Sequence, residues 1–163
     1  MTASPTTTAA QGRRNLAQFD VANRVFFRLY QSSNLMHKVG TRFIANFGAT
    51  TQQWAVIGAL ARPKALADGM TVKELLEFLL VSRQNLSPVL DRLEERGWIE
   101  RVKDPADGRS RRIGLTPVGQ QIWAQMLASI EDFYVEALGD FTVEDQVMLY
   151  RLLDRLKLNL ARL

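Results

Sequence analysis

A short polar run, Ser82-Arg83-Gln84-Asn85, contains the side chains best suited to reading another molecule. An arginine guanidinium can bind both major-groove acceptors of guanine, and a glutamine or asparagine amide can pair with adenine in the same two-point manner. Ser87 lies about one helical turn after Arg83 and could reach the same surface. The alternative is that these residues only cap a helix and face solvent, which is the commoner role of polar residues at a helix start. The elements around the run decide between the two.

The polar run opens the second of two short predicted helices. The first helix begins at Thr71, because Thr71 and Glu74 have the spacing of a capping box. The second has Ser82 as its N-cap and ends at Gly97, with leucines at helical spacing in between. Since so few residues separate the helices, the chain must turn sharply there, as in a helix-turn-helix.

Two predicted strands follow, Trp98–Val102 and Arg111–Leu115, joined by turn-forming residues at 104–109. The basic residues of this hairpin are Arg101, Lys103, Arg109, Arg111 and Arg112. A helix-turn-helix followed by a hairpin is a winged helix, and the usual function of a winged helix is to read duplex DNA. Within this pattern, base reading by the polar run outweighs simple capping.

Further helices are predicted on both sides of the winged helix. No proline occurs between Arg13 and Phe47, and apolar residues recur there at helical spacing, so we predict one long helix that could bend near residues 31–33. Thr116-Pro117 is a typical helix start, and the last helix carries more leucines than one face of a small domain needs. We therefore expect these helices to pack against a second subunit. A helical bundle within one chain is the alternative.

The predicted fold class is mainly α with a small β wing: a winged helix-turn-helix domain plus a helical dimerisation region. We assign residues 1–12 to a disordered tail and residues 13–48 and 117–163 to the dimerisation region. Residues 49–116 form the predicted DNA-binding domain, in which 62–69 is expected to be a loop.

The composition argues against several classes of site. The 163 residues include one histidine and no cysteine, so we expect neither a metal site nor a cofactor. No apolar run is long enough to cross a bilayer, and the N-terminus lacks the pattern of a signal peptide; we expect a cytoplasmic protein with no membrane partner. The sequence also has no phosphate-binding glycine loop and no nucleophile–base arrangement, so we do not expect an enzyme.

Six short motifs occur in order along the chain: Gln53-Trp54, Glu74-Leu75, Val81-Ser82-Arg83, Asp91-Arg92-Leu93-Glu94-Glu95-Arg96-Gly97, Asp104-Pro105-x-Asp107-x-Arg109 and Leu115-Thr116-x-x-Gly119. Together they make the chain resemble the MarR family of bacterial regulators over roughly residues 15–160. The resemblance implies a homodimer that binds double-stranded DNA at a palindromic operator, usually a repressor that a small molecule releases. The residues expected to contact DNA are Thr71, Ser82, Arg83, Gln84, Asn85, Ser87, Asp107, Arg109, Arg111 and Arg112.

Three positions in the helices depart from the family pattern. Leu76 stands where a small residue usually lets the two helices approach, and Leu80 stands where glycine often makes the turn. Pro88 replaces a common arginine inside the second helix, where a proline deletes a backbone hydrogen bond and costs about 3 kcal/mol. Because Ser87-Pro88 is itself a typical helix start, residues 82–87 could form a separate first turn.

The tip of the predicted wing keeps two residues of the family pattern and changes one. Asp107 and Arg109 are present, whereas Gly108 stands between them where the family commonly has arginine. We expect Arg109 to enter the minor groove, where narrow A·T-rich stretches concentrate negative potential, and Asp107 to orient it by ion pairing. A solvated hairpin tip is the alternative.

The family also implies a pocket for a small, aromatic and acidic effector. Candidates to line this pocket are His37, Arg42, Phe43, Phe47, Trp54 and Trp123. The aromatic residues would bury a ring, and a basic face of the first helix, with Arg24 and Arg28, would attract its carboxylate. Such aromatic residues are more often plain core. A winged helix that acts only in protein–protein contact is the alternative function, but its exposed arginines would then be superfluous.

Overall fold

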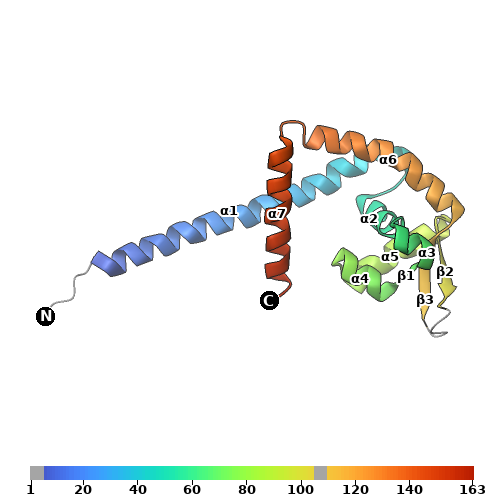
Figure 1. Ribbon diagram of the computed structural model, residues 1–163, viewed down its shortest axis with the longest axis horizontal. Helices are drawn as coiled ribbons and strands as arrows, with labels where there is room; N and C mark the ends of the chain where they lie inside the picture. The colour runs from blue at the N-terminus through green and yellow to red at the C-terminus, as the bar shows by residue number, and fades with distance from the viewer. Residues whose placement is uncertain (1–5, 105–109) are drawn as a thin grey trace.

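The computed structural model describes the backbone of residues 6–104 and 110–163, and within these ranges the side chains from residue 17 onward. Three helices lie outside the winged-helix part: α1 (Thr6–Phe43), α6 (Pro117–Ala137) and α7 (Val143–Leu160). In Figure 1, α1 extends far beyond the rest of the chain, α6 meets its C-terminal end, and α7 hangs from the end of α6. Among the described residues, no helix combines the length and apolar character needed to cross a membrane.

The middle of the chain folds into a winged helix. Its helical elements are η1 (Ala45–Phe47), α2 (Thr51–Leu60), α3 (Pro63–Asp68), α4 (Val72–Leu79) and α5 (Arg83–Glu95). Its strands are β1 (Met70–Thr71), β2 (Ile99–Lys103) and β3 (Arg111–Leu115), which form an antiparallel sheet in the order β1-β3-β2. The predicted class, mainly α with a small β wing, is confirmed.

One apolar core holds the winged helix together and continues into α6. Leu75 of α4 and Leu93 of α5 are fully buried, and so is Ile113 of β3. Met126 of α6 is equally inaccessible and belongs to the same cluster. Burying such side chains contributes about 1.5–3 kcal/mol each, so the core fixes where α5 and the hairpin lie relative to α6.

Side-chain caps explain where several helices begin. Thr71 accepts a hydrogen bond from the Glu74 N–H at 3.2 Å, while the Glu74 carboxylate accepts from the Thr71 N–H at 2.7 Å. The same reciprocal arrangement joins Thr142 and Asp145 at the start of α7. Each capping box satisfies backbone donors that the helix leaves free, as the sequence predicts for α4.

The structure corrects the sequence prediction in three places. Helix α1 begins at Thr6, inside the predicted disordered tail, because alanine, glutamine and arginine favour helix and no proline interrupts 6–62. The predicted loop at 62–69 contains α3, with Pro63 in its first turn, where proline's fixed φ suits a helix. The short strand β1, which pairs Met70 with Ile113, was not predicted.

Gly119 of α6 packs closely against Trp98, the residue before β2. A Cβ placed at residue 119 would lie 1.9 Å from the carbonyl oxygen of Trp98. Gly119→Ala should therefore lower the free energy of unfolding by about 2 kcal/mol, because the backbone must shift to relieve the overlap. Gly114→Ala is the control, since nothing lies within 4 Å of its added Cβ. Equal urea-unfolding midpoints for both variants would contradict this packing.

Candidate nucleic-acid interface

The turn between α4 and α5 has the tight geometry of a helix-turn-helix. Helix α4 ends at Leu79, and Leu80 adopts a left-handed conformation with φ of 54°, the region that usually favours glycine. The Ser82 side chain then accepts a hydrogen bond from the Asn85 N–H at 3.3 Å and caps α5. Leu80 thus takes the left-handed conformation that glycine adopts most easily, and the turn forms with leucine at this position.

Helix α5 buries one face and presents the predicted polar run on another. Leu86, Leu90 and Leu93 are buried in the core. Arg83, Gln84 and Asn85 are exposed, as expected for residues that read DNA. The helix runs without interruption from Arg83 to Glu95, so the separate first turn suggested for residues 82–87 does not form. The buried leucines on both sides of Pro88 hold this helix together.

Two further predicted DNA contacts have partners inside the chain. The Thr71 hydroxyl donates to the Glu74 carboxylate at 3.0 Å and is half-buried, so capping occupies it. The hydrogen bond from the Thr71 backbone N–H lowers the pKa of the Glu74 carboxyl. Ser87 is half-buried and its hydroxyl donates to the Arg83 carbonyl at 3.0 Å. The hydroxyl oxygens of Thr71 and Ser87 can still accept hydrogen bonds, but the hydrogen bonds they donate within the protein fix their orientation.

The guanidinium of Arg112, a predicted DNA contact, is held within the protein. Nη1 donates to the Asp104 carboxylate at 3.0 Å, Nη2 to the Gly69 carbonyl at 3.1 Å, and Nε to the Asp68 carbonyl at 2.5 Å. Glu74 lies 3.6 Å away, and the hydrogen bond to Asp104 raises the pKa of Arg112. Arg112 therefore ties β3 to α3 and α4, whereas its neighbour Arg111 is exposed.

Arg101 forms a second link, which the sequence analysis did not predict. This β2 residue makes ion pairs with two acids of α5, to Asp91 at 2.6 Å and to Glu94 at 3.1 Å. The hairpin is thereby fixed against α5, and part of the negative charge late in that helix is compensated. The spacing of the two acids, one turn apart before a strand arginine, was the available signal. The predicted contacts Asp107 and Arg109 lie outside the described residues.

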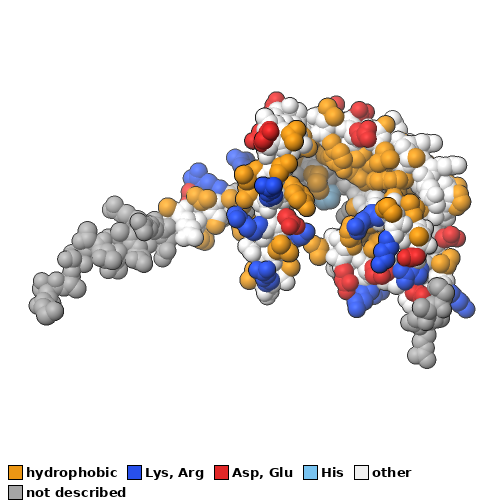
Figure 2. Space-filling view, in the orientation of Figure 1, with side chains coloured by type: hydrophobic (Ala, Val, Ile, Leu, Met, Phe, Trp, Pro, Cys, Tyr) orange, Lys and Arg blue, Asp and Glu red, His pale blue; other side chains and the backbone are white. Residues whose placement is uncertain are grey.

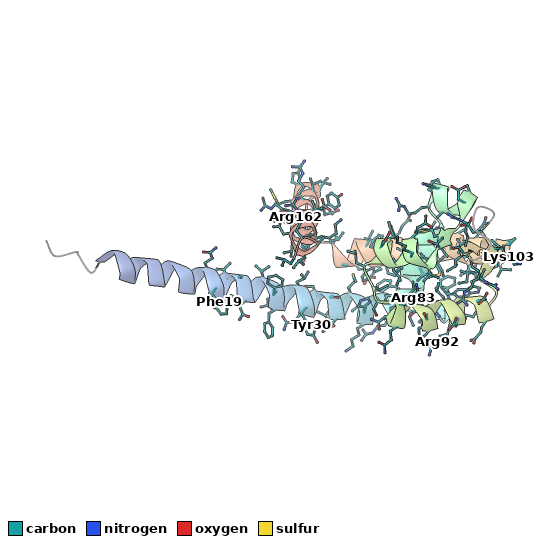
Figure 3. All side chains as sticks on the ribbon, turned by 90° about the horizontal axis from the view of Figure 1, so that it is seen from below. Phe19, Tyr30, Arg83, Arg92, Lys103 and Arg162 are labelled. Atoms are coloured by element: carbon teal, nitrogen blue, oxygen red, sulfur yellow. The ribbon has the colours of Figure 1, made fainter. Side chains whose placement is uncertain are left out.

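The figures place these side chains at one end of the molecule. Figure 3 shows Arg83 and Arg92 along α5 and Lys103 on the hairpin, far from Phe19 on α1. In Figure 2, basic and acidic side chains are interspersed over the winged helix, whereas hydrophobic side chains gather over α6 and along α7. On the face seen in Figure 2, no large patch of one sign covers the winged helix.

The predicted effector residues do not form one pocket. Phe43 and Trp54 pack edge-on against Phe133, with ring centroids 5.5 and 6.0 Å apart. Phe47 packs against the winged-helix core, and Trp123 packs against Gly58 of α2. These four aromatic residues are core or near-core, which was the alternative interpretation of their spacing.

The basic residues of α1 lie at different places along the helix. Arg42 is exposed and lies about 140° round the helix from His37. Arg24 and Arg28 line a groove between α1 and α7, together with Leu149. Within one chain, Arg24 and Arg28 lie about 22 Å or more along α1 from Phe43, too far to pair with a ring bound beside it.

His37 alone of the predicted effector residues borders a cavity between α1 and the helix-turn-helix. The cavity has a volume of ≈250 Å³. It is lined by His37, Thr51, Gln52, Ala55, Val56, Leu79, Val81, Asn85, Leu86 and Val89. His37 Nδ1 lies 2.7 Å from the Thr51 hydroxyl oxygen. We call this space the His37 cavity; it touches the first turn of α5, so an occupant could act on the DNA-reading helix.

Comparison with known proteins agrees with this geometry. The profile of the MarR family matches residues 47–110. The chain is 46% identical over 147 residues to the transcriptional activatory protein BadR of Rhodopseudomonas palustris. The matched region covers 86% of this chain and 83% of that protein. It is 30% identical over 105 residues to the homoprotocatechuate degradative operon repressor of Escherichia coli, covering 64% and 68%.

Solved structures share the fold as well. Reduced AbfR bound to DNA, a protein of Staphylococcus epidermidis, superposes with a TM-score of 0.70 at 26% identity, covering 88% of this chain and 98% of that one. The winged-helix fold of this chain is thus a known architecture. On this identity and this fold, the chain belongs to the MarR family of winged helix-turn-helix transcriptional regulators.

Proposed function

We propose that this regulator binds a palindromic operator as a homodimer and that a small aromatic effector releases it. The observation that carries the proposal is the exposed start of α5, where Arg83, Gln84 and Asn85 follow the N-cap Ser82. This N-terminal end is the part of a DNA-reading helix that enters the major groove. Reading of bases would fall to these three residues, with guanine suited to the arginine and adenine to the amides.

The remaining contacts in the proposal are to the DNA backbone. Ser82 caps α5 by accepting a hydrogen bond, so its hydroxyl proton and the free backbone N–H groups at the start of α5 would meet phosphates. Thr71 would do so only by turning its hydroxyl proton from Glu74 to a phosphate. Ser87 lies one turn further along and would contact a phosphate by turning its hydroxyl proton away from the Arg83 carbonyl. Exposed Arg111 would add a phosphate contact from β3. Arg109, oriented by Asp107, remains our prediction for the minor groove. Arg112 is omitted because its guanidinium is held inside the protein.

The homodimer is proposed from the apolar surface of the outer helices. Within α7, which is described along its whole length, no residue is buried. Leu149, Leu153 and Leu158 are 39–49% exposed, and on α1 Phe19 and Phe27 are 72% and 61% exposed. A monomer in water would leave this surface unburied at a cost of about 25 cal/mol per Å². A second copy of the chain would cover it with the same helices, which gives the two-fold symmetry that a palindrome requires.

The two DNA-reading helices of such a dimer should enter successive major grooves. Half-site centres would then lie about one helical turn, roughly 34 Å, apart. Occupancy of an operator that overlaps a promoter excludes polymerase, so repression is the proposed mode. One relative is named an activatory protein and another a repressor, and the position of the operator would decide the sign here. Regulation would take place in the cytoplasm, where the bacterial chromosome lies.

Release by an effector is proposed at the His37 cavity. If Thr51 donates its hydroxyl proton to His37 Nδ1, the ring carries its own proton on Nε2 and can donate to a carboxylate. Val56, Leu79 and Val89 provide apolar walls for a ring. Because Asn85 and Leu86 border the same cavity, an occupant would move the start of α5 away from its DNA-reading position.

We expect the effector and operator to weaken each other's binding by the same factor. A coupling of about 1–3 kcal/mol corresponds to between roughly 5- and 150-fold. Calorimetry of aromatic acids and their thioesters, with and without operator, measures it. His37→Ala should weaken the effector and spare DNA binding, whereas Arg42→Ala should change neither. Equal effector affinity in the presence and absence of operator would exclude the switch.

The DNA contacts are tested by salt-dependent binding of a duplex selected from random-sequence DNA by the protein itself. Arg83→Ala should cost about 1–3 kcal/mol and relax the preference for one base in each half-site. Wild type should show log affinity falling steeply with log salt concentration, because phosphate contacts release counterions. Failure to enrich any sequence, with no salt dependence, would favour the alternative of a protein–protein interaction module.

A further inference from the structure

Pro88 is an exposed residue inside α5 that the fold does not require. The helix passes through it without a break, although a proline in a helix interior costs about 3 kcal/mol and leaves the Gln84 carbonyl without its helical donor. Its side chain is exposed, so it adds nothing to the buried core formed by Leu86, Leu90 and Leu93. A residue that destabilises its helix and does not pack inside the protein can still contact a molecule that the helix binds.

The position of Pro88 on α5 is the centre of the outward face. At about 100° per residue, Leu86 and Leu90 lie about 160° from Pro88 on either side, so the proline is opposite the buried stripe. Gln84 and Arg92, one turn before and one turn after, are each about 40° away. These three residues form a ridge along α5, which we call the Gln84–Pro88–Arg92 ridge. The ridge borders one side of a groove between α5 and α2.

The ridge places a nonpolar ring between two hydrogen-bonding side chains. The Gln84 amide and the Arg92 guanidinium can contact base edges and phosphates, whereas the pyrrolidine ring of Pro88 has neither a donor nor an acceptor. Gln84 and Pro88 are about 6 Å apart along the helix axis, and base pairs are stacked about 3.4 Å apart. Pro88 would therefore face a base pair one or two steps from the one that Gln84 reads.

In the major groove, the one base feature that a nonpolar side chain can recognise is the C5-methyl group of thymine. Later in α5, the exposed carboxylate of Glu95 lies about 20° from Pro88 round the helix and would repel phosphates, so the DNA-facing stretch of this face ends before Glu95. We propose that Pro88 is a specificity-determining residue that packs on a thymine methyl beside the base read by Gln84. The proposal rests on operator binding by α5 and adds a named base at a named residue.

The test uses the duplex that wild-type protein selects from random-sequence DNA, with each thymine replaced in turn by deoxyuridine. This change removes only the methyl group. Wild type should lose about 4-fold in affinity at one thymine per half-site, and about 15-fold when both copies are replaced. Pro88→Ala should bind the unmodified duplex more weakly and lose most of its dependence on that methyl, because alanine keeps only the Cβ of the proline ring.

Pro63→Ala is the matched control, since it changes an exposed proline at the start of α3 and should keep the full methyl dependence. Thermal unfolding distinguishes loss of contact from loss of fold, and Pro88→Ala should be at least as stable as wild type. If every thymine tolerates deoxyuridine, or if the loss persists in Pro88→Ala, the proposal is wrong while operator binding stands. If wild type selects no duplex at all, operator binding and the proposal both fail.

Discussion

Leu153→Glu should convert the protein to monomers and lower its affinity for operator DNA at least 100-fold. Leu153 lies on α7, is 42% exposed and lines the groove between α1 and α7 with Val25 and Leu29. In the proposed dimer a second copy covers this mainly apolar face, so the substitution buries a carboxylate there, a cost that ion pairing with Arg24 or Arg28 of the same groove would offset only in part. Loss of the dimer separates the two DNA-reading helices and removes their joint binding to one operator.

Sedimentation at micromolar concentration and operator titration together measure this effect. Leu66→Glu is the control, because Leu66 on α3 is similarly exposed, at 46%, but belongs to neither α1 nor α7. It should leave the dimer intact. A wild-type protein that sediments as a monomer, or a Leu153→Glu variant that remains a dimer, would contradict the proposed interface.

Arg112→Ala should lower the free energy of unfolding by about 3 kcal/mol. The change removes three hydrogen bonds from one guanidinium and takes away the positive charge beside Asp104, whose side chain is 10% exposed. Hydrogen bonds to charged groups are worth about 1.5–3 kcal/mol each, less any new contacts with water. The hairpin should loosen from α3 and α4, and operator binding should fall only as a consequence.

Arg111→Ala separates this structural role from DNA contact. Arg111 is the next residue on the same strand but is exposed, so its loss should leave the urea-unfolding midpoint unchanged within error. Its effect should appear in the salt dependence of operator binding, with one phosphate contact fewer per subunit. Equal stability of the two variants would show that the Arg112 network contributes nothing to holding the hairpin.

Local patterns in the sequence predicted most of the winged helix. The capping box at Thr71 and the leucine spacing of α5 depend on residues within a few positions of one another, and both appear as expected. Pro63 was an available signal for α3 that the loop assignment overlooked. Strand β1 could not be found in this way, because its pairing with β3 joins residues about forty positions apart.

The predicted sites show the same division between local and tertiary information. A helical wheel places His37 and Arg42 on known faces of α1 but does not say which element each face meets. Arg111 and Arg112 are the same residue type and adjacent in the chain. Only the tertiary positions of Asp104, Asp68 and Gly69 give Arg112 its hydrogen bonds within the protein. Exposure of the start of α5, in contrast, follows from the buried leucines next to it.

Hydroxyl-radical footprinting of the selected operator duplex tests most directly whether this regulator reads DNA as a two-fold dimer through α5 and the hairpin. The account predicts protection in two symmetry-related half-sites with centres about one helical turn apart. Arg83→Ala should weaken protection in both halves equally. Protection of a single half-site, or uniform protection without two-fold symmetry, would contradict the account.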